Sequence, residues 1–222
     1  MKPPSIAQVI RRLQRAYGPH PWKTWGPPLG ELVATILSQN TTDSNSGMAY
    51  ERLRQAYPTW DRAADAPPGK IATLIRPAGL HRQKARHIRT ILRRIRVERG
   101  RASLDFLRRW PTDRIKEYLL ALPGVGPKTA ACVLCFSLRR PVLPVDTHVG
   151  RVSRRLGLIA QRTTAEEAHD LLLPMVPPAQ VYTFHVLLIQ HGRKTCRARR
   201  PDCAACALAD ICPSAFKCRP ET

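Results

Sequence analysis

Apolar side chains recur at intervals of three and four residues along most of the chain, which is the spacing of one face of an α-helix. One such set consists of Leu32, Val33, Ile36 and Leu37. Asp43 is expected to cap the helix that follows this set. The segment 142–145 is apolar but short, and Pro144 interrupts it, so it predicts no strand. The pattern therefore predicts an all-α fold.

Capping residues and prolines set the ends of the predicted helices. Residues 164–167 read Thr-Ala-Glu-Glu, which is a capping box, and Pro174 is expected to end the helix that this box opens. A further helix is predicted over about residues 179–191, after two consecutive prolines. The 21 prolines of the chain, about twice the usual share, are typical of many short helices.

One predicted helix, over residues 81–98, carries two stripes of side chains. The apolar stripe consists of Ala85, Ile88, Ile91, Leu92 and Ile95. The other, called here the arginine stripe, consists of Arg82, Arg86, Arg89, Arg93 and Arg96. A charged stripe is usually a solvated face, but arginines with almost no acidic neighbours also suit contact with phosphates. Both interpretations remain open at this point.

Basic residues greatly outnumber acidic ones: 37 lysines and arginines against 16 aspartates and glutamates give a net charge of +21. Because like charges repel one another in the folded state, such an excess favours a polyanionic partner, and we expect nucleic acid. The alternatives are a basic surface kept for solubility and an acidic membrane surface. No lipidation signal or terminal polybasic cluster supports the membrane.

The sequence also predicts where the protein works. Its longest apolar run covers the seven residues 130–136, far short of the ~18 needed to span a bilayer. The first residues, Met-Lys-Pro-Pro, are not followed by the apolar stretch of a secretory signal. We expect a cytoplasmic monomer with no membrane partner, associated with the nucleoid in a bacterium or an archaeon.

A glycine-containing turn at residues 122–130, Leu-Pro-Gly-Val-Gly-Pro-Lys-Thr-Ala, joins two predicted helical stretches. Gly124 and Gly126 permit a tight turn with bare backbone, and Pro127 suits the first position of a helix. Free N–H groups beside a helix N-terminus together bind a phosphate, although an ordinary helix–helix turn contains the same residue types. Lys128 adds chemistry, because the helix dipole disfavours its ammonium form and a neutral amine is a nucleophile for an anomeric carbon.

Asp146 stands 18 residues after Lys128, directly before Thr147 and His148. An aspartate in front of a helix is most often an N-cap. Here it is also a candidate for the carboxylate that assists the departure of a base and accepts a proton from the lysine.

The seven cysteines are unevenly placed. Cys132 and Cys135 share one face of an apolar helix and are expected to be small core residues. Four of the others follow the pattern Cys196-x6-Cys203-x2-Cys206-x5-Cys212, which predicts a metal site. Four thiolates can hold zinc, but zinc modules usually contribute two Cys-x2-Cys knuckles and this segment contains one. Cys218 lies beyond this spacing and is expected to be a free thiol.

Together these features resemble the endonuclease III class of DNA glycosylases. The turn 122–130 followed by residues 145–148 resembles the helix-hairpin-helix and Gly/Pro…Asp signature of that class, and the four-cysteine spacing matches its [4Fe–4S] loop. The resemblance runs from about residue 32 to residue 212. It implies a bifunctional glycosylase and AP lyase of base excision repair, acting on double-stranded DNA that contains damaged bases or abasic sites. Such an enzyme removes oxidised or damaged pyrimidines and cleaves 3′ to the abasic site by β-elimination.

The resemblance also assigns roles to residues of this chain. It implies that Lys128 forms the Schiff base and that Asp146 is the catalytic aspartate. It implies that the ligands of the [4Fe–4S] cluster are Cys196, Cys203, Cys206 and Cys212. The residues that contact DNA would be Gln39, Asn40, Leu80, Gly124, Gly126 and His148. Either Gln39 or Asn40 would fill the gap left by a flipped nucleotide, while Leu80 would wedge into the opposite strand.

The resemblance further implies a two-domain architecture. A six-helix barrel with the helix-hairpin-helix would span residues 24–139, and an iron–sulfur domain would combine residues 1–23 with 140–222, its cluster loop at 196–212. Compared with bacterial enzymes of this class, the chain between Leu80 and the hairpin is several residues longer, at about residues 99–113, which could alter the lesions that fit. Two alternatives stay open: a monofunctional mismatch or adenine glycosylase, which usually lacks the hairpin lysine, and a non-catalytic DNA-binding redox sensor, which needs neither Lys128 nor Asp146.

Overall fold

The computed structural model describes residues 2–217, which contain helices, turns and loops and no β-strand. The predicted all-α fold is therefore confirmed. The chain forms two compact units. The central unit is Thr24–Arg140, and the flanking unit combines the residues before and after it. Cys218 lies outside the described residues, so its expected free thiol stays a prediction.

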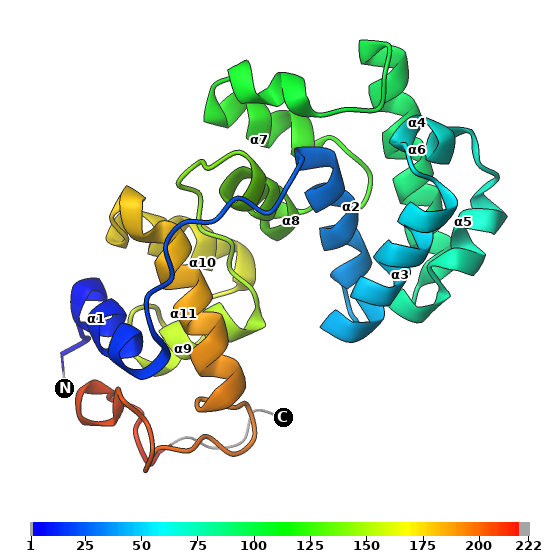
Figure 1. Cartoon of the computed structure of the whole chain (residues 1–222). Helices are drawn as coiled ribbons and strands as arrows, with labels where there is room; N and C mark the ends of the chain where they lie inside the picture. Colours follow the sequence, from blue (N-terminus) through cyan, green and yellow to red (C-terminus); the bar gives the residue numbers. More distant parts are fainter. Residues whose placement is uncertain (1, 218–222) are drawn as a thin grey trace. The chain divides into compact units, whose positions relative to one another are not determined.

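The central unit is built from helices joined by turns and short helical segments (Figure 1), and their apolar side chains form a buried core. In chain order they are α2 (Pro28–Ser38), α3 (Asp43–Ala56), α4 (Trp60–Asp65), α5 (Pro68–Leu74), α6 (His81–Arg99), α7 (Thr112–Leu120) and α8 (Pro127–Cys132). Helix α6 packs against α4 and α5, and α2 packs against α3 and α8. The predicted apolar set of α2, from Leu32 to Leu37, is completely buried, as the spacing of these residues requires. Cys132 and Cys135 are also buried, which confirms them as core residues.

Shorter helical segments connect the helices of the central unit. The 3₁₀-helix η1 (Arg76–Ala78) leads into α6, and a π-helical turn, η3 (Val133–Ser137), continues α8. The segment 99–113 contains the 3₁₀-helix η2 (Asp105–Arg109) and folds against α7. There the rings of Phe106 and Trp110 both pack edge-on against the ring of Tyr118.

The cap of α3 differs from the sequence prediction. Thr42, not Asp43, is the N-cap: its backbone is extended, and its hydroxyl accepts the N–H of Asn45. Asp43 is the first helical residue, where its negative charge favours the helix N-terminus through the dipole instead. Both residue types suit the start of a helix, so the sequence pattern misplaced the boundary by one position.

Two arginines of the arginine stripe on α6 bind other residues of the central unit. Arg89 donates to the carbonyl oxygen of Ala66 at 3.0 Å, and Arg96 binds both carboxylate oxygens of Asp65 at 2.6 and 2.8 Å. These two arginines therefore hold α6 against the end of α4. Arg82, Arg86 and Arg93 differ from them in having no hydrogen-bond acceptor among the described residues, and all three are exposed.

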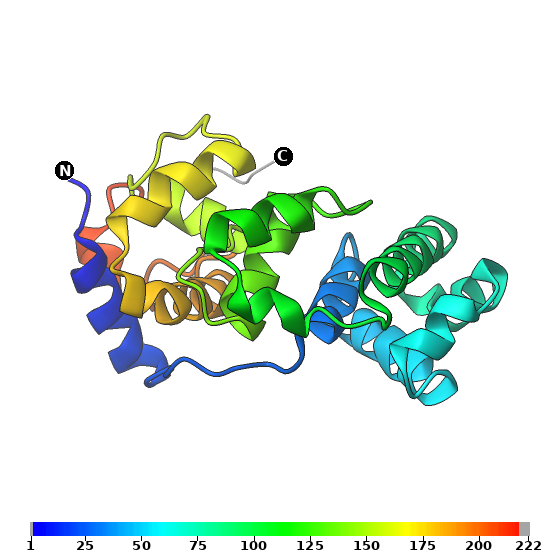
Figure 2. The ribbon, with the colours of Figure 1, turned by 90° about the horizontal axis from the view of Figure 1, so that it is seen from above.

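The flanking unit consists of α1 (Ile6–Tyr17), α9 (Thr147–Arg155), α10 (Ala165–Leu172) and α11 (Val181–Lys194), followed by the cysteine segment. Helix α11 contacts both α1 and α9, and it lies beside α1 in both views (Figures 1 and 2). The predicted capping box at Thr164 is present, and α10 ends before Pro174. Helix α11 begins two residues later than predicted, because residues 178–180 form a 3₁₀ turn. No helix of the described chain has the length and apolar character needed to cross a membrane.

Candidate active site and cysteine pocket

The turn between α7 and α8 has the conformation that its two glycines permit. Gly124 has φ +75°, a left-handed value, and a Cβ atom there would overlap the ring of His87. Gly126 is extended, and no heavy atom lies within 4 Å of the position that its Cβ would occupy. Leu122 and Val125 are buried and anchor the turn. The first glycine is therefore required by the fold, whereas the second leaves open space in front of the backbone.

This open space adjoins the start of α8. Within residues 2–217, the N–H groups of Gly126, Lys128 and Thr129 have no hydrogen-bond acceptor. Pro127 has no N–H to contribute. The first N–H groups of a helix point out of its N-terminal end. A helix N-terminus with unpaired donors and an open approach favours an anion. The side chain of Lys128 is half-buried beside these groups and belongs to none of the ion pairs of the described chain.

Glu31 of α2 shares the surroundings of Lys128, and sequence reasoning did not identify it. Burial raises the pKa of the Glu31 carboxyl, while a hydrogen bond from the Thr35 hydroxyl and the positive charge of Lys128 lower it. A buried carboxyl near an amine can accept or return a proton. The sequence signal was a glutamate at the start of a helix that is otherwise almost entirely apolar.

Asp146 is the N-cap of α9, in the flanking unit. Its Oδ1 accepts the N–H of Val149 at 2.7 Å, and its Oδ2 has no hydrogen-bond donor within the described chain. The cap fixes the carboxylate and leaves one oxygen for another group, so the two interpretations of Asp146 are compatible.

His148 lies in the first turn of α9. Its Nδ1 is 3.0 Å from Nη2 of Arg151, and the ring also forms a hydrogen bond with the backbone of Gly192. Burial lowers the pKa of His148, Asp146 raises it, and Arg151 lowers it further. The ring packs against Gly192 of α11, where a Cβ atom would be only 2.9 Å from Cβ of His148.

Gln39 and Asn40 follow α2 and differ sharply in their contacts. The Gln39 amide donates to the carbonyl oxygen of Gly124 at 3.0 Å and lies 3.3 Å from Oγ1 of Thr129. Asn40 is exposed and has φ +52°. The side chain of Gln39 is therefore bound to the hairpin, and Asn40 is the one that faces solvent.

Leu80 precedes α6 and is also exposed, at 55% of its surface, with φ +45°. A left-handed backbone at a residue other than glycine is unfavourable in the free protein. Such a residue at a loop tip marks a candidate contact with another molecule.

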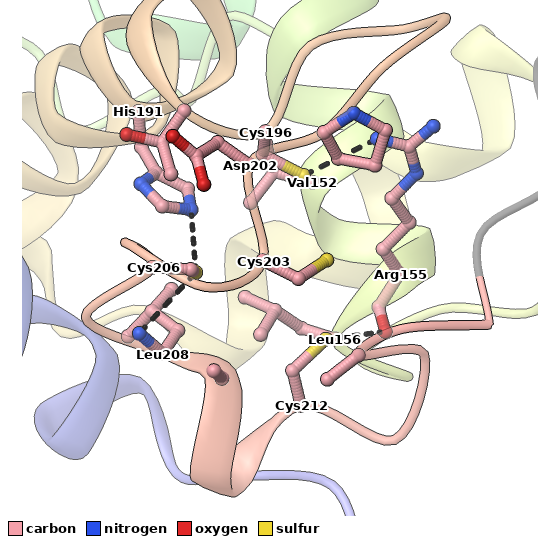
Figure 3. Close-up of a pocket in the computed structure, with 14 residues that line it drawn as sticks. Val152, Arg155, Leu156, His191, Cys196, Asp202, Cys203, Cys206, Leu208 and Cys212 are labelled. Carbon is pink, nitrogen blue, oxygen red and sulfur yellow. Dashed lines mark hydrogen bonds between the residues drawn. The ribbon is translucent and has the colours of Figure 1, made fainter.

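The four clustered cysteines line one pocket of the flanking unit (Figure 3). None of them forms a disulfide. The apolar side chains Val152, Leu156 and Leu208 form other parts of the wall. Burial, opposed by the N–H of Leu208 and reinforced by the other three cysteines, raises the pKa of the Cys206 thiol to about 11. Four neighbouring thiolates would repel one another, so this arrangement suits the ligands of a positively charged metal centre.

The pocket contains donors directed at sulfur. Arg155 donates to Sγ of Cys196 at 3.4 Å and is itself held by the carbonyl oxygens of Arg197 and Ala198. The N–H of Leu208 donates to Sγ of Cys206 at 3.4 Å. Hydrogen bonds of this kind stabilise coordinating thiolates. Four cysteines around one shared space, with donors at two of their sulfur atoms, have the chemistry of a metal–thiolate site.

Comparisons with known proteins agree with this geometry. A family model described as HhH-GPD superfamily base excision DNA repair protein matches residues 33–178. Endonuclease III of Thermotoga maritima is 37% identical over 185 residues, which cover 83% of this chain and 82% of that enzyme. A relative from Arabidopsis thaliana is 37% identical over 189 residues, and the chain spans 64% of its length.

Among solved structures, a trapped covalent intermediate of endonuclease III with DNA has a TM-score of 0.82 and 30% identity, over 96% of each chain. The identity, the coverage and the shared helical fold all point to one family. The chain therefore belongs to the HhH-GPD superfamily of base excision DNA repair proteins, as a member of its endonuclease III family.

Proposed function

We propose that the protein is a bifunctional DNA glycosylase and AP lyase that removes oxidised or damaged pyrimidines from duplex DNA. The observation that carries this proposal is Lys128, an amine in the first turn of α8 next to N–H groups that are open to a phosphate. Endonuclease III relatives and the trapped covalent DNA intermediate of one of them support the same activity. A net charge of +21 suits a DNA partner.

In the first step the lone pair of the Lys128 amine forms a bond to C1′ of the damaged nucleotide. The C1′–N bond to the base breaks at the same carbon, and the base departs with that electron pair and takes up a proton. Phosphate binding at Gly126 and the start of α8 would hold the sugar next to the amine. Such positioning supplies much of the rate of a step of this kind.

Asp146 has the second role in this chemistry. Its unpaired Oδ2 can stabilise positive charge that develops on the sugar and can accept the proton that the amine loses. Opening of the sugar ring then gives an imine between Lys128 and C1′. Loss of a proton from C2′ expels the 3′-phosphate and cleaves the strand, and hydrolysis of the imine returns the amine.

Base removal also requires that the nucleotide leave the helical stack. Asn40 and Leu80, two exposed left-handed residues of the central unit, are proposed to enter the duplex. Asn40 is favoured over Gln39 as the residue that fills the gap, because the Gln39 side chain is bound to Gly124 and Thr129.

The residues proposed to hold a [4Fe–4S] cluster are Cys196, Cys203, Cys206 and Cys212. Four cysteine ligands leave no position open for chemistry at iron, so the cluster would supply structure and no reaction step. Arg155 binds both Cys196 and the segment after it, and this contact would place the basic residues around Cys196 for docking to phosphates.

The test of the proposed function is covalent trapping. Wild-type protein incubated with borohydride and a duplex that contains one thymine glycol is expected to give a stable protein–DNA adduct, because borohydride reduces an imine to an amine. Lys128→Gln should give no adduct and should still bind the duplex. A Lys128→Gln protein that is trapped as efficiently as wild type would remove Lys128 from this role. A panel of duplexes, each with one defined lesion, then identifies the preferred base.

A further inference from the structure

Lys84 is a buried cation to which the mechanism above assigns no role. It lies in the first turn of α6 and is only 2% exposed. Its Nζ donates to the carbonyl oxygens of Leu37 at 2.8 Å, Gln39 at 2.6 Å and Ala78 at 2.8 Å. An ammonium group has three N–H donors, so all of them are used. No ion pair of the described chain includes Lys84, and carbonyl dipoles alone compensate its charge.

The three carbonyls belong to the ends of two other elements. Those of Leu37 and Gln39 lie at the C-terminus of α2, and that of Ala78 ends η1. Carbonyls at a helix C-terminus lack partners within the helix and carry the negative end of its dipole. Lys84 therefore caps the ends of two segments at once from the start of a third.

Each capped end is followed within two residues by an exposed residue with a left-handed backbone. Asn40 follows Gln39, and Leu80 follows Gly79, whose own φ is +66°. Both Asn40 and Leu80 have left-handed backbones, and Asn40 is exposed while Leu80 exposes more than half of its surface. Backbone strain of this kind persists only where the surrounding structure over-determines the conformation, and it clusters at functional sites. We refer to Asn40 and Leu80 as the two tips.

We propose that Lys84 is a positioning residue for base extrusion: by holding the carbonyls of Gln39 and Ala78, it fixes the separation and direction of the two tips. The inference rests on the proposed function, in which these tips enter the duplex. Gln39 extends the same network, because its side chain donates to the carbonyl oxygen of Gly124. Gln39 thereby links the buried ammonium of Lys84 to the turn between α7 and α8, which precedes Lys128.

The variant that tests this is Lys84→Met, which keeps the length of the side chain and removes all three donors. The matched control is Leu92→Ala, a fully buried apolar position two turns further along α6. The two proteins are compared at equal loss of melting temperature, adjusted if needed with Leu92→Val. Lys84→Arg is a second variant, which keeps the charge but replaces a tetrahedral donor by a planar one.

Two readouts separate positioning from stability. The first needs no DNA: hydrogen exchange of the Gln39 and Gly79 amides, which are bonded to Ile36 and Arg76, should accelerate in Lys84→Met and not in the control. The second is single-turnover base release from a thymine glycol duplex with 2-aminopurine beside the lesion. Lys84→Met should bind undamaged duplex as wild type does, lose the rise of 2-aminopurine fluorescence, and release the base about a hundredfold more slowly. Lys84→Arg should show the same losses to a smaller degree.

The inference is overturned if exchange of the Gln39 and Gly79 amides is unchanged in Lys84→Met. It is also overturned if Lys84→Met and the control lose base release equally, because Lys84 then contributes only stability. If Lys84→Met does not fold, Lys84→Arg decides the question by the same two readouts. Wild-type protein that releases no damaged base would refute the proposed function, and the exchange experiment would still decide whether Lys84 holds the tips.

Discussion

Replacing Gly126 by alanine is expected to weaken DNA binding without changing stability. Gly126 is the N-cap of α8, its φ is −99°, and open space surrounds the position of a Cβ. Alanine is a poorer N-cap than glycine, by about 1 kcal/mol. It also restricts the unfolded chain, which stabilises the protein by about 0.4–1 kcal/mol. The two effects nearly cancel, so the melting temperature should stay close to that of wild type.

The effect on DNA follows from the same open space. A methyl group at Gly126 would stand where a phosphate must approach the N–H groups of the first turn of α8. The loss of a hydrogen bond to a charged group costs about 1.5–3 kcal/mol, which corresponds to about a 10- to 150-fold increase in Kd. Because the lost contact is made by uncharged N–H groups, the slope of log K against log salt should stay close to that of wild type. Fluorescence-anisotropy titrations at several salt concentrations measure both quantities.

Gly124→Ala provides the opposite result in the same turn. Its left-handed φ of +75° costs an alanine about 1–2 kcal/mol, and the methyl group would in addition overlap His87. This variant should lose melting temperature clearly, whereas Gly126→Ala should not. Wild-type affinity of Gly126→Ala at every salt concentration would refute phosphate binding by this turn. An equal loss of stability in both variants would refute the geometry.

Three further predictions concern other parts of the molecule. Purified protein should be yellow-brown, with about four iron atoms and four sulfides per chain. Cys203→Ser should lose the colour, while Cys132→Ala should keep it. A colourless active protein that contains one zinc ion would contradict the proposed cluster. Because the pKa of Glu31 is raised in the folded protein, the contribution of this residue to stability falls as pH rises above the unfolded value of about 4.3. Glu31→Gln should therefore raise the melting temperature at pH 7 and not at pH 4. An equal change of melting temperature at both pH values would contradict this. Replacing both Arg82 and Arg86 by alanine should flatten the slope of log K against log salt by up to about 1.8, whereas Arg89→Ala should mainly lower stability. A slope equal to that of wild type in the double variant would show that the arginine stripe is a solvated face.

The features that the sequence predicts well are those encoded within a few neighbouring residues. The helical spacing of α2, the capping box at Thr164 and the apolar stripe of α6 each specify a local structure, and the all-α fold is confirmed. The roles of Lys128, Asp146 and the four cysteines stay predictions with a consistent geometry. The division into a barrel domain and an iron–sulfur domain also stays a prediction, because the two units do not reveal their roles by their boundaries.

The features that the sequence did not predict depend on contacts between distant segments. In the sequence, Arg89 and Arg96 are members of the arginine stripe. Only the fold shows that α4 and the residue after it provide their hydrogen-bond acceptors. Glu31 could be linked to Lys128 only by the fold. Lys84 did leave one signal: it lies four residues before Ile88, on the apolar stripe of α6, where a lysine is expected only if its charge is satisfied. The oxygens that accept the hydrogen bonds of Lys84 could not be predicted, because they belong to backbone carbonyls and every residue has one.

The tips show why the free protein keeps an unfavourable local structure. Both Asn40 and Leu80 have left-handed backbones, which lowers the stability of the free protein. If the tips were disordered before binding, ordering them at the duplex would cost about 1–2 kcal/mol for each residue fixed. Because Lys84 and Gln39 already fix the adjoining backbone, that cost is met during folding and not during base extrusion. More of the energy of phosphate binding is then available to unstack the damaged base.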